Sequence, residues 1–222
     1  MSELPLTEVE IQTGDATLTG DLAVPPGAKG LVVFAHGSGS SRFSSRNRFV
    51  AESLNQAGLA TLLFDLLTDE EQEIDSRTRH LRFDIELLAR RMTGTVDWVK
   101  QNPQTAELKI GLFGASTGAA GALVTAAERP EKVTAIVSRG GRPDLAGHSL
   151  EHVQAPTLLI VGGNDVPVIG MNREAAEQME AAHVQIDIVP GASHLFEEPG
   201  RLEEVAELAR DWFKQYLEDA QS

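Results

Sequence analysis

Five short, almost continuously apolar runs constrain the fold of this chain more than any other feature. Segments with helical periodicity lie between them. Short runs of this kind are typical of strands buried on both faces, which occur where helices cover both sides of a parallel sheet. The sequence therefore predicts an α/β fold whose central strands are Leu31–Ala35, Leu59–Leu63, Lys109–Phe113, Val133–Val137 and Thr157–Val161.

The rest of the chain extends this sheet at both ends. Polar and apolar residues alternate in Thr7–Thr13 and Thr17–Val24 around a Gly-Asp turn, which predicts an antiparallel hairpin. Val184–Val189 predicts an eighth strand, and the acidic segment Thr68–Arg79 is expected to be an exposed loop or a frayed helix start. Together these elements predict a three-layer α/β/α sandwich with a mostly parallel eight-stranded sheet and an antiparallel N-terminal edge. Its helices are expected at Arg46–Ala57, Leu81–Val99, Thr117–Glu128, about Asn172–Ala181 and Leu202–Tyr216.

Length and composition bound the class of protein. At 222 residues we expect a single domain over residues 1–222, and the segment Ser138–Ala155 is too short for a separate cap domain. The formal net charge of −14 argues against nucleic-acid binding, because phosphates would be repelled. The lack of cysteine excludes disulfides, thiolate metal sites and a cysteine nucleophile. No signal-peptide pattern or apolar run of membrane-spanning length is visible, so we expect a cytoplasmic protein without a membrane partner.

A turn rich in small residues follows the strand at Lys109–Phe113. Its sequence, Gly114-Ala-Ser116-Thr-Gly118, has the Gly-x-Ser-x-Gly form of a nucleophile elbow between a strand and a helix. Such a turn holds the serine in a strained conformation so that its hydroxyl stands clear of the sheet. Glycines on either side avoid collisions with the neighbouring strand and helix. A tight turn without chemistry is the alternative, but the pattern favours Ser116 as a nucleophile.

A serine hydroxyl needs a base, and the base needs an orienting acid. Asp165 and His194 each come just after a predicted strand, so we expect both at the sheet edge that carries Ser116. The chain order Ser, Asp, His is the order expected for an elbow serine on such a sheet. Asp165 could instead cap the following helix, and His194 could be a loop histidine. Three matches in the expected order favour a Ser116–Asp165–His194 triad.

Two backbone N–H groups are candidates for binding an oxyanion. One belongs to Thr117, directly after the nucleophile, and the other to Ser38, in the glycine-rich loop that begins at His36. A plain glycine-rich connector is the alternative, and a phosphate-binding loop would need a lysine that is absent here. His36 itself is expected to hold the loop by hydrogen bonds rather than to react.

From about Leu31 to its end, the chain resembles the α/β-hydrolase fold, specifically the small, cap-less members similar to dienelactone hydrolases and bacterial carboxylesterases. The resemblance implies Ser116 as nucleophile, Asp165 as triad acid and His194 as general base, with Ser38 and Thr117 at the oxyanion hole. Dienelactone hydrolases use cysteine as the nucleophile, whereas this chain has serine, so the shared reaction class is a better expectation than that particular substrate. No metal site and no cofactor are indicated.

Two arginines near the predicted site are candidates for binding a substrate carboxylate. Arg42 lies in the loop after His36, and Arg139 follows the strand at Val133–Val137. The interpretation favoured here is that they pair with Asp65, Asp69, Glu70 or Asp144 and shape loops.

The sequence thus predicts a serine hydrolase that cleaves small carboxylic esters or lactones through an acyl-enzyme intermediate. The expected partner is a small-molecule ester, and the expected state is a monomer or a homodimer. The alternatives are a thioesterase, amidase or acyltransferase with the same triad, or a non-catalytic small-molecule-binding protein of this fold.

Overall fold

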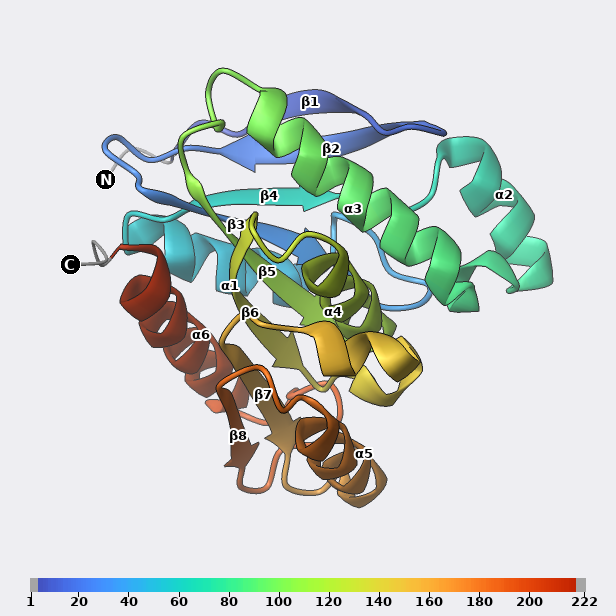
Figure 1. Cartoon of the computed structure of the whole chain (residues 1–222), viewed down its shortest axis with the longest axis vertical. Coiled ribbons are helices and arrows are strands. Elements are labelled where there is room, and N and C mark those ends of the chain that lie inside the picture. Colours follow the sequence, from blue (N-terminus) through green and yellow to red (C-terminus); the bar gives the residue numbers. More distant parts are fainter. Residues whose placement is uncertain (1–3, 219–222) are drawn as a thin grey trace.

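The computed structural model describes residues 4–218, which form an eight-stranded sheet between two layers of helices (Figure 1). The strand order is β1-β2-β4-β3-β5-β6-β7-β8. β1, β2 and β4 pair antiparallel, and all pairs from β4 onward are parallel. This confirms the predicted fold class, including its antiparallel N-terminal edge. The strands are β1 (Thr7–Gln12), β2 (Thr17–Ala23), β3 (Gly30–Ala35), β4 (Ala60–Phe64), β5 (Lys109–Ala115), β6 (Val133–Arg139), β7 (Thr157–Gly162) and β8 (Val184–Val189).

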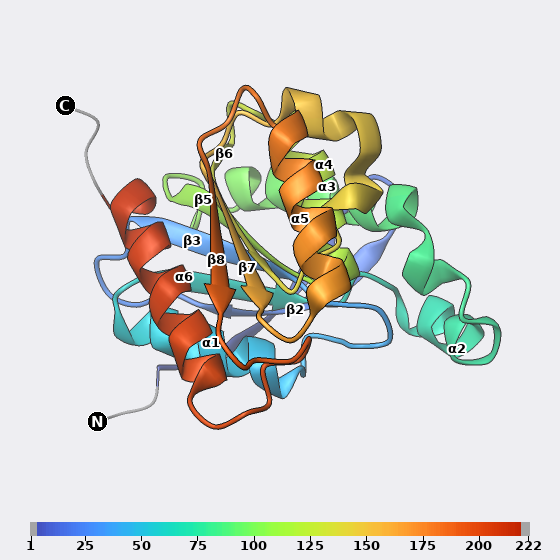
Figure 2. The ribbon, with the colours of Figure 1, turned by 90° about the horizontal axis from the view of Figure 1, so that it is seen from below.

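Helices cover the two faces of the sheet. α1 (Ser45–Gln56) and α6 (Arg201–Leu217) pack on one face, whereas α3 (Ile85–Gln101), α4 (Thr117–Glu128) and α5 (Val166–Gln178) pack on the other (Figure 2). Because both faces are covered, β3, β4 and β7 are buried along their whole length, which explains their uninterrupted apolar sequences.

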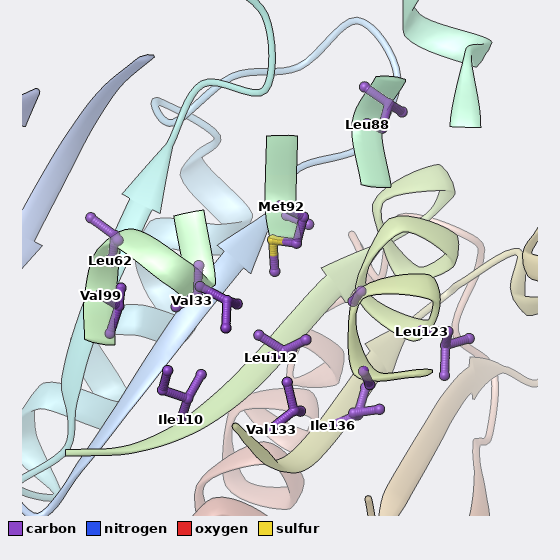
Figure 3. Close-up of a cluster of buried hydrophobic side chains, with 14 of the residues drawn as sticks. Val33, Leu62, Leu88, Met92, Val99, Ile110, Leu112, Leu123, Val133 and Ile136 are labelled. Atoms are coloured by element: carbon purple, nitrogen blue, oxygen red, sulfur yellow. The ribbon is translucent and has the colours of Figure 1, made fainter. Parts of the chain in front are cut away.

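Each helical layer has its own hydrophobic core. The core under α3 and α4 includes Met92, Leu112, Leu123 and Ile136 (Figure 3). The opposite core joins α1 and α6 to the sheet through residues such as Phe34, Phe113 and Phe213. Within residues 4–218, no helix combines the length and the apolar character needed to cross a lipid bilayer.

The acidic segment predicted as a loop or frayed start is a regular helix, α2 (Asp69–Thr78). The Thr68 hydroxyl accepts the N–H of Glu71, and the Glu71 carboxylate accepts the N–H of Thr68, which makes a capping box. The Glu71 carboxylate also accepts two hydrogen bonds from Arg91 of α3, at 3.0 and 2.7 Å. Polar contacts hold α2 in place. The helix lacks the apolar stripe by which helices are recognised in a sequence, so it was not predicted as a regular helix.

Two further segments refine the prediction. α5 begins at Val166, earlier than expected, with Pro167 in its first turn, a position that suits proline. Between β6 and β7 the chain forms a short 3-10 helix, η2 (Pro143–His152), which packs on α4. A single 3-10 turn, η1 (Leu81–Phe83), precedes α3.

Candidate active site

Ser116 occupies a strained turn between β5 and α4. Its φ of 51° and ψ of −121° are unusual for a residue with a side chain. The flanking glycines make the turn possible: a Cβ at Gly114 would lie 2.4 Å from the Cα of Ala119, and one at Gly118 would lie 2.4 Å from the carbonyl oxygen of Ala35. The packing role predicted for these glycines is therefore confirmed.

The loops after β7 and β8 bring Asp165 and His194 together. The Oδ2 atom of Asp165 lies 2.6 Å from Nδ1 of His194. Asp165 is the N-cap residue of α5, yet its side chain caps no backbone N–H of that helix. The carboxylate of Asp165 therefore contacts the imidazole and does not cap the helix. Because Nδ1 of His194 is occupied by this contact, Nε2 is the ring nitrogen that can face a hydroxyl.

Gly140 connects this pair to the elbow. The Ser116 N–H donates to the carbonyl oxygen of Arg139 at 3.2 Å, so Gly140 directly follows a residue bonded to the elbow. A Cβ at Gly140 would lie only 3.6 Å from Cε1 of the His194 ring. Both side chains belong to the described residues, and no hydrogen bond joins the Ser116 hydroxyl to the ring of His194. Such bonds often tighten only when substrate binds. The imidazole lies beside Gly140, the residue that follows the acceptor of the Ser116 N–H.

The loop after β3 packs directly against Ser116. A Cβ at Gly37 would lie 3.2 Å from the Cβ of Ser116, so only glycine allows this approach. The hydroxyls of Ser38 and Thr117 lie 2.8 Å apart and join the loop to the start of α4. Among the described residues, neither the N–H of Ser38 nor that of Thr117 has a protein acceptor. Their role as oxyanion donors stays a prediction.

His36 holds this loop, as the sequence predicted. Its Nε2 accepts the N–H of Leu66 at 3.1 Å, and its Nδ1 lies 2.9 Å from the carbonyl oxygen of Gly37. This arrangement fits the neutral tautomer with the proton on Nδ1. Burial lowers the pKa of His36, which keeps the ring neutral.

A cavity of about 190 Å³ opens beside this loop. Its walls combine apolar side chains such as Leu66 and Leu88 with a polar pair, Asp75 and Arg82. Nε of Arg82 donates to Oδ2 of Asp75 at 2.7 Å. Burial alone would raise the pKa of Asp75, but the hydrogen bonds from Arg82 outweigh it and lower that pKa. This pair was not predicted from the sequence, because Asp75 lies in the segment Thr68–Arg79 that was expected to be an exposed loop or a frayed helix start.

A second residue missed from the sequence is Glu198, which fixes the loop that carries His194. Both oxygens of Glu198 accept the N–H of Ser193 at 3.0 Å. This hydrogen bond lowers the pKa of Glu198. The sequence signal that could have indicated this contact is the position of Glu198, a carboxylate four residues after His194 in the same loop.

The two candidate arginines differ in their surroundings. Arg42 lies within 3.5 Å of the carboxylates of Glu8, Asp21 and Asp65, so its charge is compensated inside the protein. Burial is the main reason that the pKa of Asp65 is raised. Arg139 is buried and makes no ion pair among the described residues. The interpretation as a loop-shaping residue therefore fits Arg42 but not Arg139.

The sheet order and the elbow are those of the α/β-hydrolase fold. A family model described as "Dienelactone hydrolase family" matches residues 18–219. The chain therefore belongs to the dienelactone hydrolase family.

Known proteins similar to this chain include a dienelactone hydrolase from Anabaena variabilis. Its crystal structure has 62% sequence identity and a TM-score of 0.95, covering 97% of this chain and 100% of that chain. Est1E from Butyrivibrio proteoclasticus shares the fold at 16% identity and a TM-score of 0.78, covering 96% of this chain and 99% of its own. Relatives from two strains of Mycobacterium tuberculosis carry the provisional name phosphoribosyl transferase and are 57% identical over 210 residues, which is 95% of this chain and 46% of theirs. The chain thus spans about half the length of the curated relatives it matches.

Proposed function

We propose that this protein is a serine hydrolase that cleaves small carboxylic esters or lactones through an acyl-enzyme intermediate. The observation that carries the proposal is the 2.6 Å contact between Asp165 and His194 beside the strained Ser116. An oriented imidazole next to a protruding hydroxyl is the arrangement that turns serine into a nucleophile. No contact among the described residues favours phosphoribosyl transfer over this chemistry.

In the proposed cycle, the Ser116 hydroxyl attacks the acyl carbon and gives its proton to Nε2 of His194. The N–H groups of Ser38 and Thr117 donate to the oxygen that becomes negatively charged, which is worth about 3 kcal/mol per donor in such sites. The protonated His194 then gives its proton to the departing alkoxide. Water, activated by the same imidazole, hydrolyses the acyl-enzyme. Asp165 fixes the tautomer throughout and stabilises the charged ring.

The neighbouring cavity of about 190 Å³ is lined in part by the Ser38 loop, whereas Ser116, Asp165 and His194 do not line it. In this proposal it takes a short acyl or alcohol group, which corresponds to a small substrate. Its mixed lining favours a group that is partly apolar and partly polar. That the partner is a small ester rather than a nucleic acid or a membrane stays a prediction, as do the cytoplasmic location and the monomeric or homodimeric state.

Labelling with a fluorophosphonate tests the nucleophile directly. The wild-type protein should be labelled, and the Ser116→Ala variant should not. The same substitution should lower turnover of p-nitrophenyl acetate by roughly three to six orders of magnitude while the unfolding transition is preserved. A Ser116→Ala protein that kept its labelling or its esterase activity would remove Ser116 from the mechanism.

A further inference from the structure

The loop that carries Ser38 needs an anchor outside itself. Ser38 lies between Gly37 and Gly39, and the N–H of Ser40 donates to the carbonyl oxygen of Gly37 at 3.1 Å, which closes a β-turn. Gly39 has a φ of 71°, which glycine adopts without strain. Ordering glycine costs more backbone entropy than ordering any other residue. A turn of this composition therefore keeps one conformation only when other parts of the protein hold it.

The Ser38 hydroxyl makes two contacts of this kind. It donates to the carbonyl oxygen of Arg82 at 3.1 Å, and it lies 2.8 Å from the hydroxyl of Thr117. A hydroxyl group has one proton, and a carbonyl oxygen can only accept. Because the Ser38 proton goes to Arg82, the Thr117 hydroxyl is the donor in the second bond. The two bonds therefore run in one direction, from Thr117 through Ser38 to Arg82.

Arg82 is held in turn by α2. Its N–H and its Nε donate to the two carboxylate oxygens of Asp75, at 3.1 and 2.7 Å. Asp75 belongs to α2 and is only 3% exposed. Gly39 lets the guanidinium lie against the loop, because a Cβ at that position would be 2.7 Å from Nη1 of Arg82. Since both its main chain and its side chain are bound to Asp75, Arg82 offers Ser38 a fixed carbonyl oxygen.

The other end of this network lies beside the nucleophile. Thr117 directly follows Ser116, begins α4 and is 5% exposed. In the proposed cycle, the N–H groups of Ser38 and Thr117 bind the oxyanion, so the bond between their side chains sets the spacing of the two donors. Donors that are fixed before the reaction need no reorganisation when negative charge develops, which makes them effective in catalysis.

We propose that the hydroxyls of Ser38 and Thr117 position the two oxyanion donors, with Arg82 and Asp75 as their anchor. The four side chains act through the main chain and do not touch the reacting atoms. The inference rests on the proposed function and adds positioning residues to it. It also gives α2 a role in the reaction, because the network ends on that helix.

The kinetic test compares three threonine variants of α4. Thr117→Val keeps the size of the side chain and the N–H but removes the hydroxyl, whereas Thr117→Ser keeps a hydroxyl. Turnover of p-nitrophenyl acetate by Thr117→Val should fall by about tenfold to hundredfold in kcat/KM, because a misplaced donor loses much of its effect. Thr117→Ser should retain most of the wild-type value.

Thr125→Val is the matched control. The hydroxyl of Thr125 lies 3.1 Å from that of Thr93, in a buried contact between α3 and α4. The substitution therefore removes the same kind of contact from the same helix, away from Ser116, and should leave kcat/KM unchanged. Thr117→Val with wild-type kcat/KM, or a loss of the same size in Thr125→Val, would overturn the proposal.

A transition-state analogue reports on the donors directly. When 1,1,1-trifluorohexan-2-one binds, the Ser116 oxygen adds to its carbonyl carbon, the hydroxyl proton passes to His194, and the carbonyl oxygen becomes the anion that the donors bind. Its inhibition constant should rise in Thr117→Val by about the factor by which kcat/KM falls. Hexan-2-one, bound as the unreacted ketone, should inhibit both proteins equally. An equal loss of affinity for both ketones would show a general structural change and would overturn the positioning role.

Amide hydrogen exchange tests the anchor without turnover. Exchange in residues 36–41 should be faster in Ser38→Ala, Thr117→Val and Asp75→Asn than in the wild-type protein, and unchanged in Thr125→Val. Unchanged exchange in the first three variants would overturn the proposal. A wild-type protein that neither hydrolyses esters nor reacts with a fluorophosphonate would contradict the proposed function, whereas faster exchange in the same three variants would still support the network as the anchor of the loop.

Discussion

Gly118 provides the sharpest test of how the elbow is built. A Cβ at this position would lie 2.4 Å from the carbonyl oxygen of Ala35 and 2.6 Å from that of His36. The backbone must move by about 1 Å to restore ordinary contacts, because the atoms that a Cβ would meet belong to the main chain and not to flexible side chains. Overpacking costs about 1–3 kcal/mol when side chains can adjust. We therefore expect Gly118→Ala to lower the unfolding free energy by about 3 kcal/mol, a large share of a total near 5–15 kcal/mol.

The same clash predicts a loss of activity. Ala35 and His36 lead into the loop that carries Ser38, so their displacement moves one proposed oxyanion donor relative to Ser116. A misplacement of about 1 Å can cost about 100-fold in rate. The assay is urea denaturation together with kcat for p-nitrophenyl acetate.

Gly121 is the matched control, since it lies one turn further along α4. A Cβ there would meet its nearest atom, the Ala89 nitrogen, at 3.7 Å, which is an ordinary contact. Gly121→Ala should raise stability by about 0.5–1 kcal/mol, because alanine is the better helix residue. The reasoning is refuted if Gly118→Ala proves as stable and as active as the wild-type protein, or if the two variants behave alike.

Three further predictions follow from single contacts. Asp165→Asn should lower kcat by roughly 10³–10⁴-fold with an unchanged unfolding transition, because the amide no longer holds the required tautomer of His194; wild-type kcat in this variant would contradict the pair's role. Burial lowers the pKa of His36, so below pH 6.5 this side chain binds a proton in the unfolded chain but not in the folded one. The free energy of unfolding should therefore fall as pH drops from 6.5 to 5.5, by up to about 1.4 kcal/mol per pH unit. His36→Gln, which can still accept the N–H of Leu66, should lose stability less steeply in denaturant titrations across this window, and equal slopes would refute the assignment. Ser116→Gly should be about 1 kcal/mol more stable than Ser116→Ala in the same denaturant assay, because glycine tolerates a φ of 51°; equal stabilities would mean that the turn stores no strain.

Much of the architecture could be predicted from the sequence because burial on both faces leaves a direct trace. β3 and β7 appear in the sequence as apolar runs because every residue in them is buried. The residues that follow these strands could be placed at one edge of the sheet, because parallel strands have their carboxyl ends at the same edge. The position of the elbow at that edge followed from this rule.

Contacts that depend on side-chain direction could not be predicted. The Ser38 and Thr117 hydroxyls meet across 79 residues of sequence, and no local pattern marks such a pair. α2 was missed because its stability comes from the capping box at Thr68 and the ion pair with Arg91, not from an apolar stripe. The sequence placed Arg139 at the sheet edge but could not reveal that no carboxylate reaches it.

The unfavourable features of this fold gather at one edge of the sheet. Among residues 4–218, Ser116 has a strained backbone, Arg139 is buried without a counter-ion, and the N–H groups of Ser38 and Thr117 lack protein acceptors. Each of these lowers the stability of the fold, and the two N–H groups would gain a partner from a ligand that supplies an oxygen. Elsewhere, buried charges such as Arg91 are paired. We therefore expect the molecule that reacts at Ser116 to supply an acceptor for the N–H groups beside it.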